Sequence, residues 1–249
     1  MRGPASKTIV GELCLEDMGI VVERVHDDPP AARPEAVDVP GRDGDMLRAV
    51  GYEPRQIVLE CRVFGKRWAD FDRAIDEIAA NAMNHGTVGL SVRTHPGETY
   101  DAVLDSITQG DRVGGTGIGY MELSFTAHDP YRRGRRRTAT IPSGGSVQFH
   151  VGGTAPADVI VESSVAVRSS GSTVWGVRFD EGAFLHVPTG SSSARRVDID
   201  CHARTVRVGN GTAMLTLDSD WPELLPGTHV ARMDEGTGAA TLIWVERSI

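Results

Sequence analysis

The spacing of hydrophobic residues changes near residue 65, and this change predicts two adjacent elements. In residues 55–64 the apolar side chains occupy every second position, at Ile57, Leu59, Cys61 and Val63. This period of two is typical of a strand with one buried face. In residues 67–84 they recur every three or four positions, at Trp68, Phe71, Ile75, Ile78 and Ala82. The sequence therefore predicts a strand followed by an amphipathic helix of about five turns.

The rest of the first half predicts strands joined by proline- and glycine-rich turns. The expected strands lie in residues 8–25, 88–94, 100–107 and 120–127, and Asp129-Pro130 stops the last of them because proline cannot donate to a ladder. Residues 26–34 hold three prolines, so we expect an extended arm without regular structure there. Gly41 and Gly44 turn the chain after it, since glycine accepts positive φ. The glycines of residues 110–119 predict a long, flexible tip.

Beyond residue 142 no helical period is present, and short apolar runs alternate with turns. The expected strands are residues 147–151, 158–167, 173–179, 183–187, 196–199, 205–208, 213–217, 229–233 and 241–246. Short strands at regular spacing favour a β-sandwich or jelly roll. The arginine run 132–137 is interpreted as the edge of a linker, which gives domains at residues 1–140 and 141–249. The predicted fold class is β-rich α+β.

The net charge, the apolar runs and the cysteines argue against several classes of protein. The net charge of −8 argues against a general nucleic-acid binder. No apolar run approaches the roughly 20 residues that cross a bilayer, and no signal-peptide block follows the N-terminus, so we expect synthesis in a cytoplasm. The three cysteines, Cys14, Cys61 and Cys201, are far apart and odd in number, which predicts reduced thiols.

No motif indicates catalysis, a metal or a cofactor. The glycine-rich tip lacks the spacing of a phosphate-binding loop and of a dinucleotide fingerprint. The eight histidines form no H-x-x-x-H pattern, and Cys201 and His202 are adjacent, so on a strand they point to opposite faces. No G-x-S-x-G elbow occurs. We therefore expect no enzyme, although a spatially assembled hydrolase site would leave no sequence signature.

An ordered set of motifs resembles the distal tail protein family of long-tailed, siphovirus-type bacteriophages. The set comprises V-P-G-R-D-G at 39–44, the strand at 55–64, the helix near Trp68, the turn at Pro96-Gly97 and Asp129-Pro130-Tyr131. In the second half, residues 152–157, the hairpin 197–206 and L-L-P-G-T at 224–228 also resemble the family. No piece is specific alone, and the resemblance lies in their order along nearly the whole chain.

The resemblance implies an architectural role in the virion. The N-terminal domain would be tail-tube-like and form a ring, a hexamer in that family, around the DNA channel. The C-terminal domain would be a galectin-like β-sandwich on the outside. The implied partners are the tail tube protein, the tail-tip hub, and receptor-binding proteins or fibres, with DNA passing the lumen without specific binding during ejection. The basic run at 132–137 departs from the family, so no role transfers to it.

Three groups of residues are predicted to make contacts. Subunit contacts in the ring are assigned to the arm and the tip: Pro40, Gly41, Arg42, Asp43, Gly44, Val113, Gly114 and Ile118. The basic run is expected to face a protein partner: Arg132, Arg133, Arg135, Arg136 and Arg137. Trp221, on a turn, is the candidate for stacking on a sugar, although packing is favoured, and Trp244 is expected in the core. The alternative function is accordingly a carbohydrate-binding module with an accessory domain.

Overall fold

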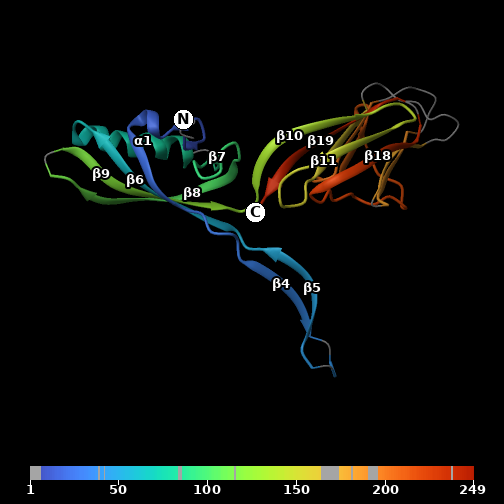
Figure 1. Ribbon diagram of the computed structural model, residues 1–249, viewed down its shortest axis with the longest axis horizontal. Helices are drawn as coiled ribbons and strands as arrows, with labels where there is room; N and C mark the ends of the chain where they lie inside the picture. The colour runs from blue at the N-terminus through green and yellow to red at the C-terminus, as the bar shows by residue number, and fades with distance from the viewer. Residues whose placement is uncertain are drawn as a thin grey trace. The chain divides into compact units, whose positions relative to one another are not determined.

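The computed structural model describes residues 7–38, 40–41, 43–83, 86–114, 116–163, 174–180, 182–189, 196–236 and 238–249. The chain divides into two compact units, the first comprising Met1–Arg133 with Ile249 and the second Gly134–Ser248. Figure 1 shows the elements of both. The division lies inside the strand β10, seven residues before the boundary expected after residue 140.

The first unit is a seven-stranded sheet in the order β2-β1-β7-β8-β9-β6-β3, with one α-helix packed on it (Figure 1). Its elements are β1 Ile9–Val10, β2 Leu13–Cys14, the 3-10 helix η1 Glu16–Met18, β3 Ile20–His26, β6 Arg55–Gly65, α1 Trp68–Ala82, β7 Thr87–Ser91, β8 Tyr100–Arg112 and β9 Gly117–Ala127. The predicted strand and helix are thus confirmed at β6 and α1. The β-rich fold class with a single α-helix among the described residues is confirmed as well.

The apolar residues of β6, at every second position, and those of α1, at every third or fourth position, pack together in one hydrophobic core between the sheet and the helix. Ile57, Leu59 and Val63 of β6 are fully or almost fully buried. Phe71 and Ile78 of α1 face them and are fully buried. At the start of the helix, the Asp70 carboxylate accepts the backbone N–H of Arg67 at 3.0 Å, which satisfies one of the donors left free at a helix N-terminus. That bond keeps the pKa of Asp70 below its usual range.

The second unit pairs a six-stranded sheet, β10-β19-β12-β15-β16-β17, with a four-stranded sheet, β11-β18-β13-β14. Its elements are β10 Arg132–Ile141, β11 Ser146–Val151, β12 Val159–Ser163, β13 Val174–Phe179, β14 Phe184–Pro188, β15 Val197–Asp200, β16 Thr205–Val208, β17 Gly211–Ala213, β18 Gly227–Glu235 and β19 Ala240–Ser248. Inward-facing residues of both sheets share one core, in which Trp175 and Trp244 are buried, so the core position expected for Trp244 is confirmed. The shared core makes this unit a β-sandwich.

Three local expectations were wrong. Proline at residue 34 does not prevent a strand, because Ala32–Asp38 forms β4 in a two-stranded hairpin whose strands are both edges. The arginine run is strand β10 and not linker, since it pairs with β19 at the edge of a sheet. Residues 214–217 lie outside strand β17, and the Met214 and Leu217 side chains are exposed.

Candidate functional site

The first candidate surface is a two-stranded hairpin that is separate from the seven-stranded sheet. Its strands are β4 Ala32–Asp38 and β5 Asp45–Tyr52, which pair antiparallel (Figure 1). We call this hairpin the arm. All of β4 and the first six residues of β5 are exposed. A lone two-stranded hairpin is marginally stable in water, so such an arm is suited to packing against another surface.

The arm carries several exposed apolar side chains. The side chains of Val37, Met46, Leu47 and Val50 are between 45% and 59% exposed. The predicted contact residues Pro40, Gly41, Asp43 and Gly44 lie at the tip of the arm, where both glycines have positive φ. Arg42 lies outside the described residues. The turn predicted from 39–44 therefore joins β4 to β5.

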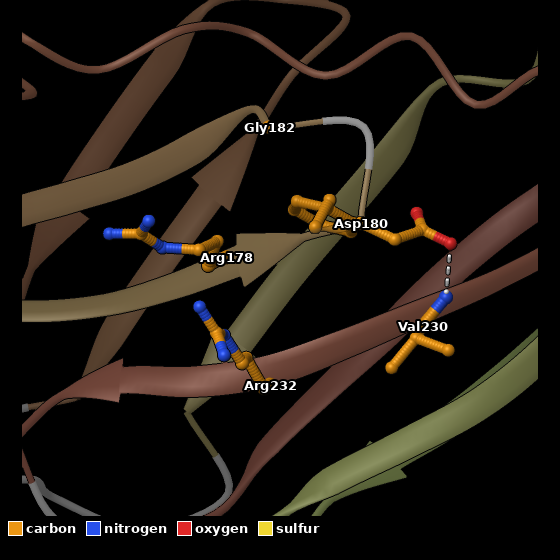
Figure 2. A pocket seen from close by; sticks show the side chains of 6 residues that line it. Arg178, Asp180, Gly182, Val230 and Arg232 are labelled. Atoms are coloured by element: carbon orange, nitrogen blue, oxygen red, sulfur yellow. Dashed lines mark hydrogen bonds between the residues drawn. The ribbon is translucent and has the colours of Figure 1, made fainter.

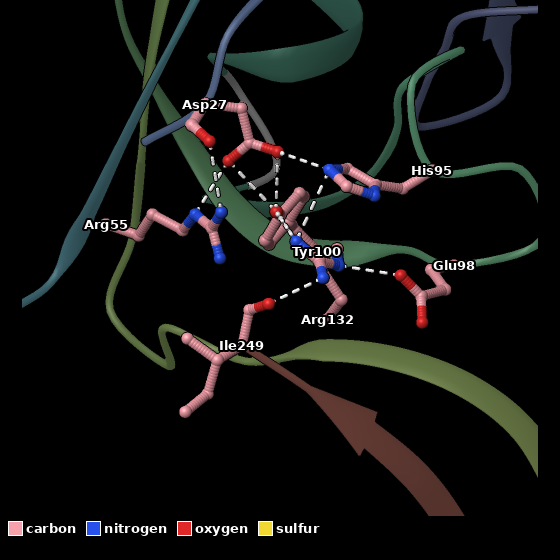
Figure 3. A network of polar contacts seen from close by, with 7 residues as sticks. All are labelled: Asp27, Arg55, His95, Glu98, Tyr100, Arg132 and Ile249. Atoms are coloured by element: carbon pink, nitrogen blue, oxygen red, sulfur yellow. Dashed lines mark hydrogen bonds and ion pairs between the residues drawn. The ribbon is translucent and has the colours of Figure 1, made fainter. Parts of the chain in front are cut away.

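A buried ionic cluster holds the base of the arm (Figure 3). Asp27 follows β3 and Arg55 begins β6, so these two residues flank the arm in sequence. Their side chains are 5% and 2% exposed, and Arg55 Nε lies 2.6 Å from Asp27 Oδ1. Arg55 Nη2 also donates to the Asp27 carbonyl oxygen at 3.2 Å. The cluster thereby ties together the two points where the chain leaves and rejoins the sheet.

The cluster extends from Asp27 through Tyr100 to Arg132 (Figure 3). The Tyr100 hydroxyl donates to Asp27 Oδ2 at 2.8 Å and accepts from Arg132 Nη1 at 3.2 Å. His95 Nε2 lies 3.2 Å from Asp27 Oδ2. Burial raises the pKa of the Tyr100 hydroxyl, so it remains a donor at any physiological pH. Removal of Asp27 would leave the buried Arg55 guanidinium without its carboxylate partner.

Arg132, predicted to face a partner, is instead buried in this cluster. Its Nε lies 2.6 Å from Glu98 Oε2, and its Nη2 donates to the Ile249 carbonyl oxygen at 2.6 Å. Arg133 pairs with Asp101, and Arg137 pairs with Glu246 at 2.9 Å. Arg135 and Arg136 are exposed on the edge strand β10. Charged side chains on an edge strand oppose unwanted strand addition, so the run has a structural explanation within the chain.

The second candidate surface, the turn between β8 and β9, is shorter than expected. Strand β8 continues to Arg112 and β9 starts at Gly117, so the turn comprises residues 113–116, of which residue 115 lies outside the described part. Val113 and Gly114 are exposed, as a contact site requires. Ile118 belongs to β9 and is half-buried, paired with Phe64 of β6. These two strands, and not a flexible loop, carry most of the predicted tip.

Sequence patterns could have revealed part of the cluster. Arg55 shares the inward face of its strand with Ile57 and Leu59, and a charged residue on such a face predicts a buried partner. Its partner Asp27 lies in the proline-rich segment, where no period assigns a face. The pairing of residues 28 positions apart therefore had no sequence signal.

The described residues offer little for catalytic chemistry. No three His, Cys, Asp or Glu side chains among them are grouped to hold a metal ion. No helix in the described part of the chain is long and apolar enough to cross a membrane. All three cysteines are unpaired thiols, and burial raises the pKa of Cys61 and of Cys201 to about 12. Trp221 is half-buried and packs against the core of the second unit, and its proposed sugar contact stays a prediction.

Comparison with solved structures finds a similar fold along nearly the whole chain. The crystal structure of the SPP1 Dit (gp 19.1) protein, described as a paradigm of the hub adsorption apparatus in phages that infect Gram-positive hosts, aligns with a TM-score of 0.77. That alignment covers 98% of this chain and 99% of that one at 20% identity. The phage P2 baseplate in its activated conformation, with Ca or with Sr, contains a chain that aligns at a TM-score of 0.50 and 11% identity, covering 93% of this chain and 92% of that one.

Comparison with protein families matches residues 152–247 to the siphovirus-type tail component, C-terminal domain. This segment contains most of the second unit. A search of curated proteins finds no match. Residues 152–247 are therefore similar in sequence to a siphovirus-type tail component domain, and both units share the fold of SPP1 Dit.

Proposed function

We propose that this protein is a structural component of a phage tail tip, in which identical copies form a ring around the DNA channel. The observation that carries the proposal is the alignment with SPP1 Dit over 98% of the chain. The ring, a hexamer by family resemblance, joins the tail tube protein to the tail-tip hub. Synthesis and assembly take place in the host cytoplasm, and the mature location is the virion tail.

The arm supplies a physical reason for copies to associate. Its exposed apolar side chains and lack of a supporting sheet favour burial on a neighbouring surface. Head-to-tail repetition of one such contact closes a ring when the rotation between copies is a whole fraction of a turn. The ionic cluster at the base of the arm fixes the points where the chain leaves and rejoins the sheet. The arm therefore begins at the same place, between Asp27 and Arg55, in every copy.

The charge of the chain fits a channel that transmits DNA without holding it. The net charge of −8 gives no cationic excess with which phosphates could pair. Within the basic run, Arg132, Arg133 and Arg137 are already paired with carboxylates of this chain. The second unit, a galectin-like sandwich in this proposal, lies outside the ring and presents receptor-binding proteins or fibres for host attachment.

Native mass spectrometry of the purified chain tests the ring. Six copies of the 26.7 kDa chain give a species of about 160 kDa. The variant Leu47→Thr with Val50→Thr keeps strand propensity in β5 and removes apolar surface from the arm, so we expect it to be monomeric. The control, Met214→Thr with Leu217→Thr, removes two apolar side chains from the second unit that are more exposed than Leu47 and Val50, and it should leave the ring intact.

Two results would contradict the proposal. One is a wild-type chain that remains monomeric at high concentration and lies off the tail axis in images of the particle. The other is an arm variant that assembles as well as the control. Circular dichroism of the arm variant shows whether loss of assembly follows from the surface change and not from unfolding.

A further inference from the structure

The outer face of the four-stranded sheet in the second unit contains a hollow of about 410 Å³ (Figure 2). It lies where β13 ends beside β18. The residues that line it are Arg178, Phe179, Asp180, Gly182, Val230 and Arg232. Its volume falls in the range of small-molecule sites and is much larger than a single inorganic anion requires.

Two arginines stand directly opposite each other at this hollow. Arg178 of β13 is the register partner of Arg232 of β18, and both point away from the core because their neighbours Val177 and Ala231 are buried. Like charges directly opposite on adjacent strands are destabilising. The repulsion is relieved when carboxylates pair with both side chains or when an anion lies between them.

Only one of the two arginines has a carboxylate. Arg178 Nη2 donates to Asp234 Oδ2 at 2.9 Å, and its guanidinium also lies 5.3 Å from the centre of the Phe184 ring. The same Asp234 oxygen is 2.7 Å from His186 Nε2, so it already has two partners. Among the described residues, Arg232 has neither an ion pair nor a side-chain hydrogen bond, and its side chain is exposed.

The acid that lines the hollow is turned away from the arginines. Asp180 Oδ2 accepts the backbone N–H of Val230 at 2.9 Å. Figure 2 shows Asp180 and Val230 on one side of the hollow and the two guanidinium groups on the other. The hollow therefore has a cationic side, where one guanidinium is unpaired and the other is shared with Asp234.

We propose that this hollow binds the anionic group of a small organic ligand, a phosphate ester or a carboxylate on a unit of monosaccharide size. A planar guanidinium matches both oxyanions with two parallel hydrogen bonds, which an ammonium cannot do. One anion placed between Arg178 and Arg232 removes their mutual repulsion, and the remaining volume holds the organic part. The site does not depend on ring formation, because all of its residues belong to one copy.

Isothermal titration calorimetry at constant ionic strength tests this site. The probes are glucose 6-phosphate, glucuronate and uncharged glucose, and glycerol 3-phosphate reports on the phosphate ester without a sugar ring. We expect saturable binding of at least one anionic sugar and none of glucose. Arg232→Ala should weaken binding about tenfold or more, since hydrogen bonds to charged groups contribute about 1.5–3 kcal/mol.

The matched control is Arg207→Ala, which removes an exposed arginine from β16 in the other sheet of the same unit. It should leave affinity unchanged. Preference for glucose 6-phosphate or for glucuronate identifies which oxyanion the site takes. The proposal is overturned if no anionic probe binds at millimolar concentration, if glucose binds equally well, or if the control weakens binding as much as Arg232→Ala does.

Discussion

At the scale of single residues, the buried ion pair between Asp27 and Arg55 is sensitive to change. Both side chains are almost fully buried. Asp27 also accepts from Tyr100, whereas the other contacts of the Arg55 guanidinium are the Asp27 carbonyl oxygen and the face of the Tyr100 ring. A buried ion pair contributes little net stability compared with apolar residues of the same volume. Loss of one partner is far more harmful, because the remaining charge has already left water.

We therefore expect Arg55→Met to destabilise the first unit by about 3–5 kcal/mol, since it leaves the Asp27 carboxylate buried without its closest cation. Urea denaturation followed by circular dichroism measures the change. The control is Arg48→Met, which breaks an exposed ion pair with Glu35 in the arm and should change stability by less than about 1 kcal/mol. Equal losses in the two variants would show that the buried pair has no special importance.

At the scale of elements, the contact between β6, β9 and the start of α1 depends on glycine. Gly65 and Gly117 are register partners at the ends of β6 and β9. A Cβ atom on Gly117 would lie 2.5 Å from the backbone of Gly65 and 2.6 Å from the backbone nitrogen of Arg67, just before the helix. These two glycines therefore permit a close approach of backbones that fixes where α1 begins.

We expect Gly117→Ala to destabilise the first unit by about 2 kcal/mol or more, because backbone atoms on two sides would have to move. Gly114→Ala is the matched control: its Cβ would meet nothing within 4 Å, and it lies in the same hairpin. Thermal unfolding of the two variants provides the comparison. A similar melting temperature for both would mean that the strand ends adjust without strain.

The sequence predicted the elements with a single period better than it predicted their ends and pairings. The alternation in β6 and the helical spacing of α1 each appear in one continuous stretch, so both elements were recognisable. Strand β10 was missed because all of its first six residues are arginine or glycine. It was also missed because its partner strand, β19, lies about 100 positions away in the sequence. The arginine run therefore gave no local sign of a strand.

The arm and the hollow in the second unit show the same limit of sequence-based prediction. The arm was expected from its prolines and its glycine turn, but its pairing as β4 and β5 required the long-range view. The hollow at Arg178 and Arg232 was not predicted, since it arises from a register between strands about 50 residues apart. Charged residues at alternate positions of a strand normally indicate a solvated face, so the sequence gave no reason to select these two.

At the scale of the whole molecule, the chain contains two separate hydrophobic cores, one in each compact unit. Each core is large enough to give its unit cooperative unfolding of its own. Ring assembly would add a concentration-dependent term to the stability of whichever unit carries the contact. The arm variant Leu47→Thr with Val50→Thr, which we expect to be monomeric, is therefore the background in which to compare the cores.

In that background, we expect Leu123→Ala and Leu242→Ala each to lower one calorimetric transition and leave the other in place. Leu123 and Leu242 are fully buried in the first and second core respectively, and Leu→Ala at such sites costs about 2–5 kcal/mol. Because the substitution and the burial are the same, each variant serves as the control for the other. A shift of both transitions by either variant would show that the two units unfold as one cooperative unit.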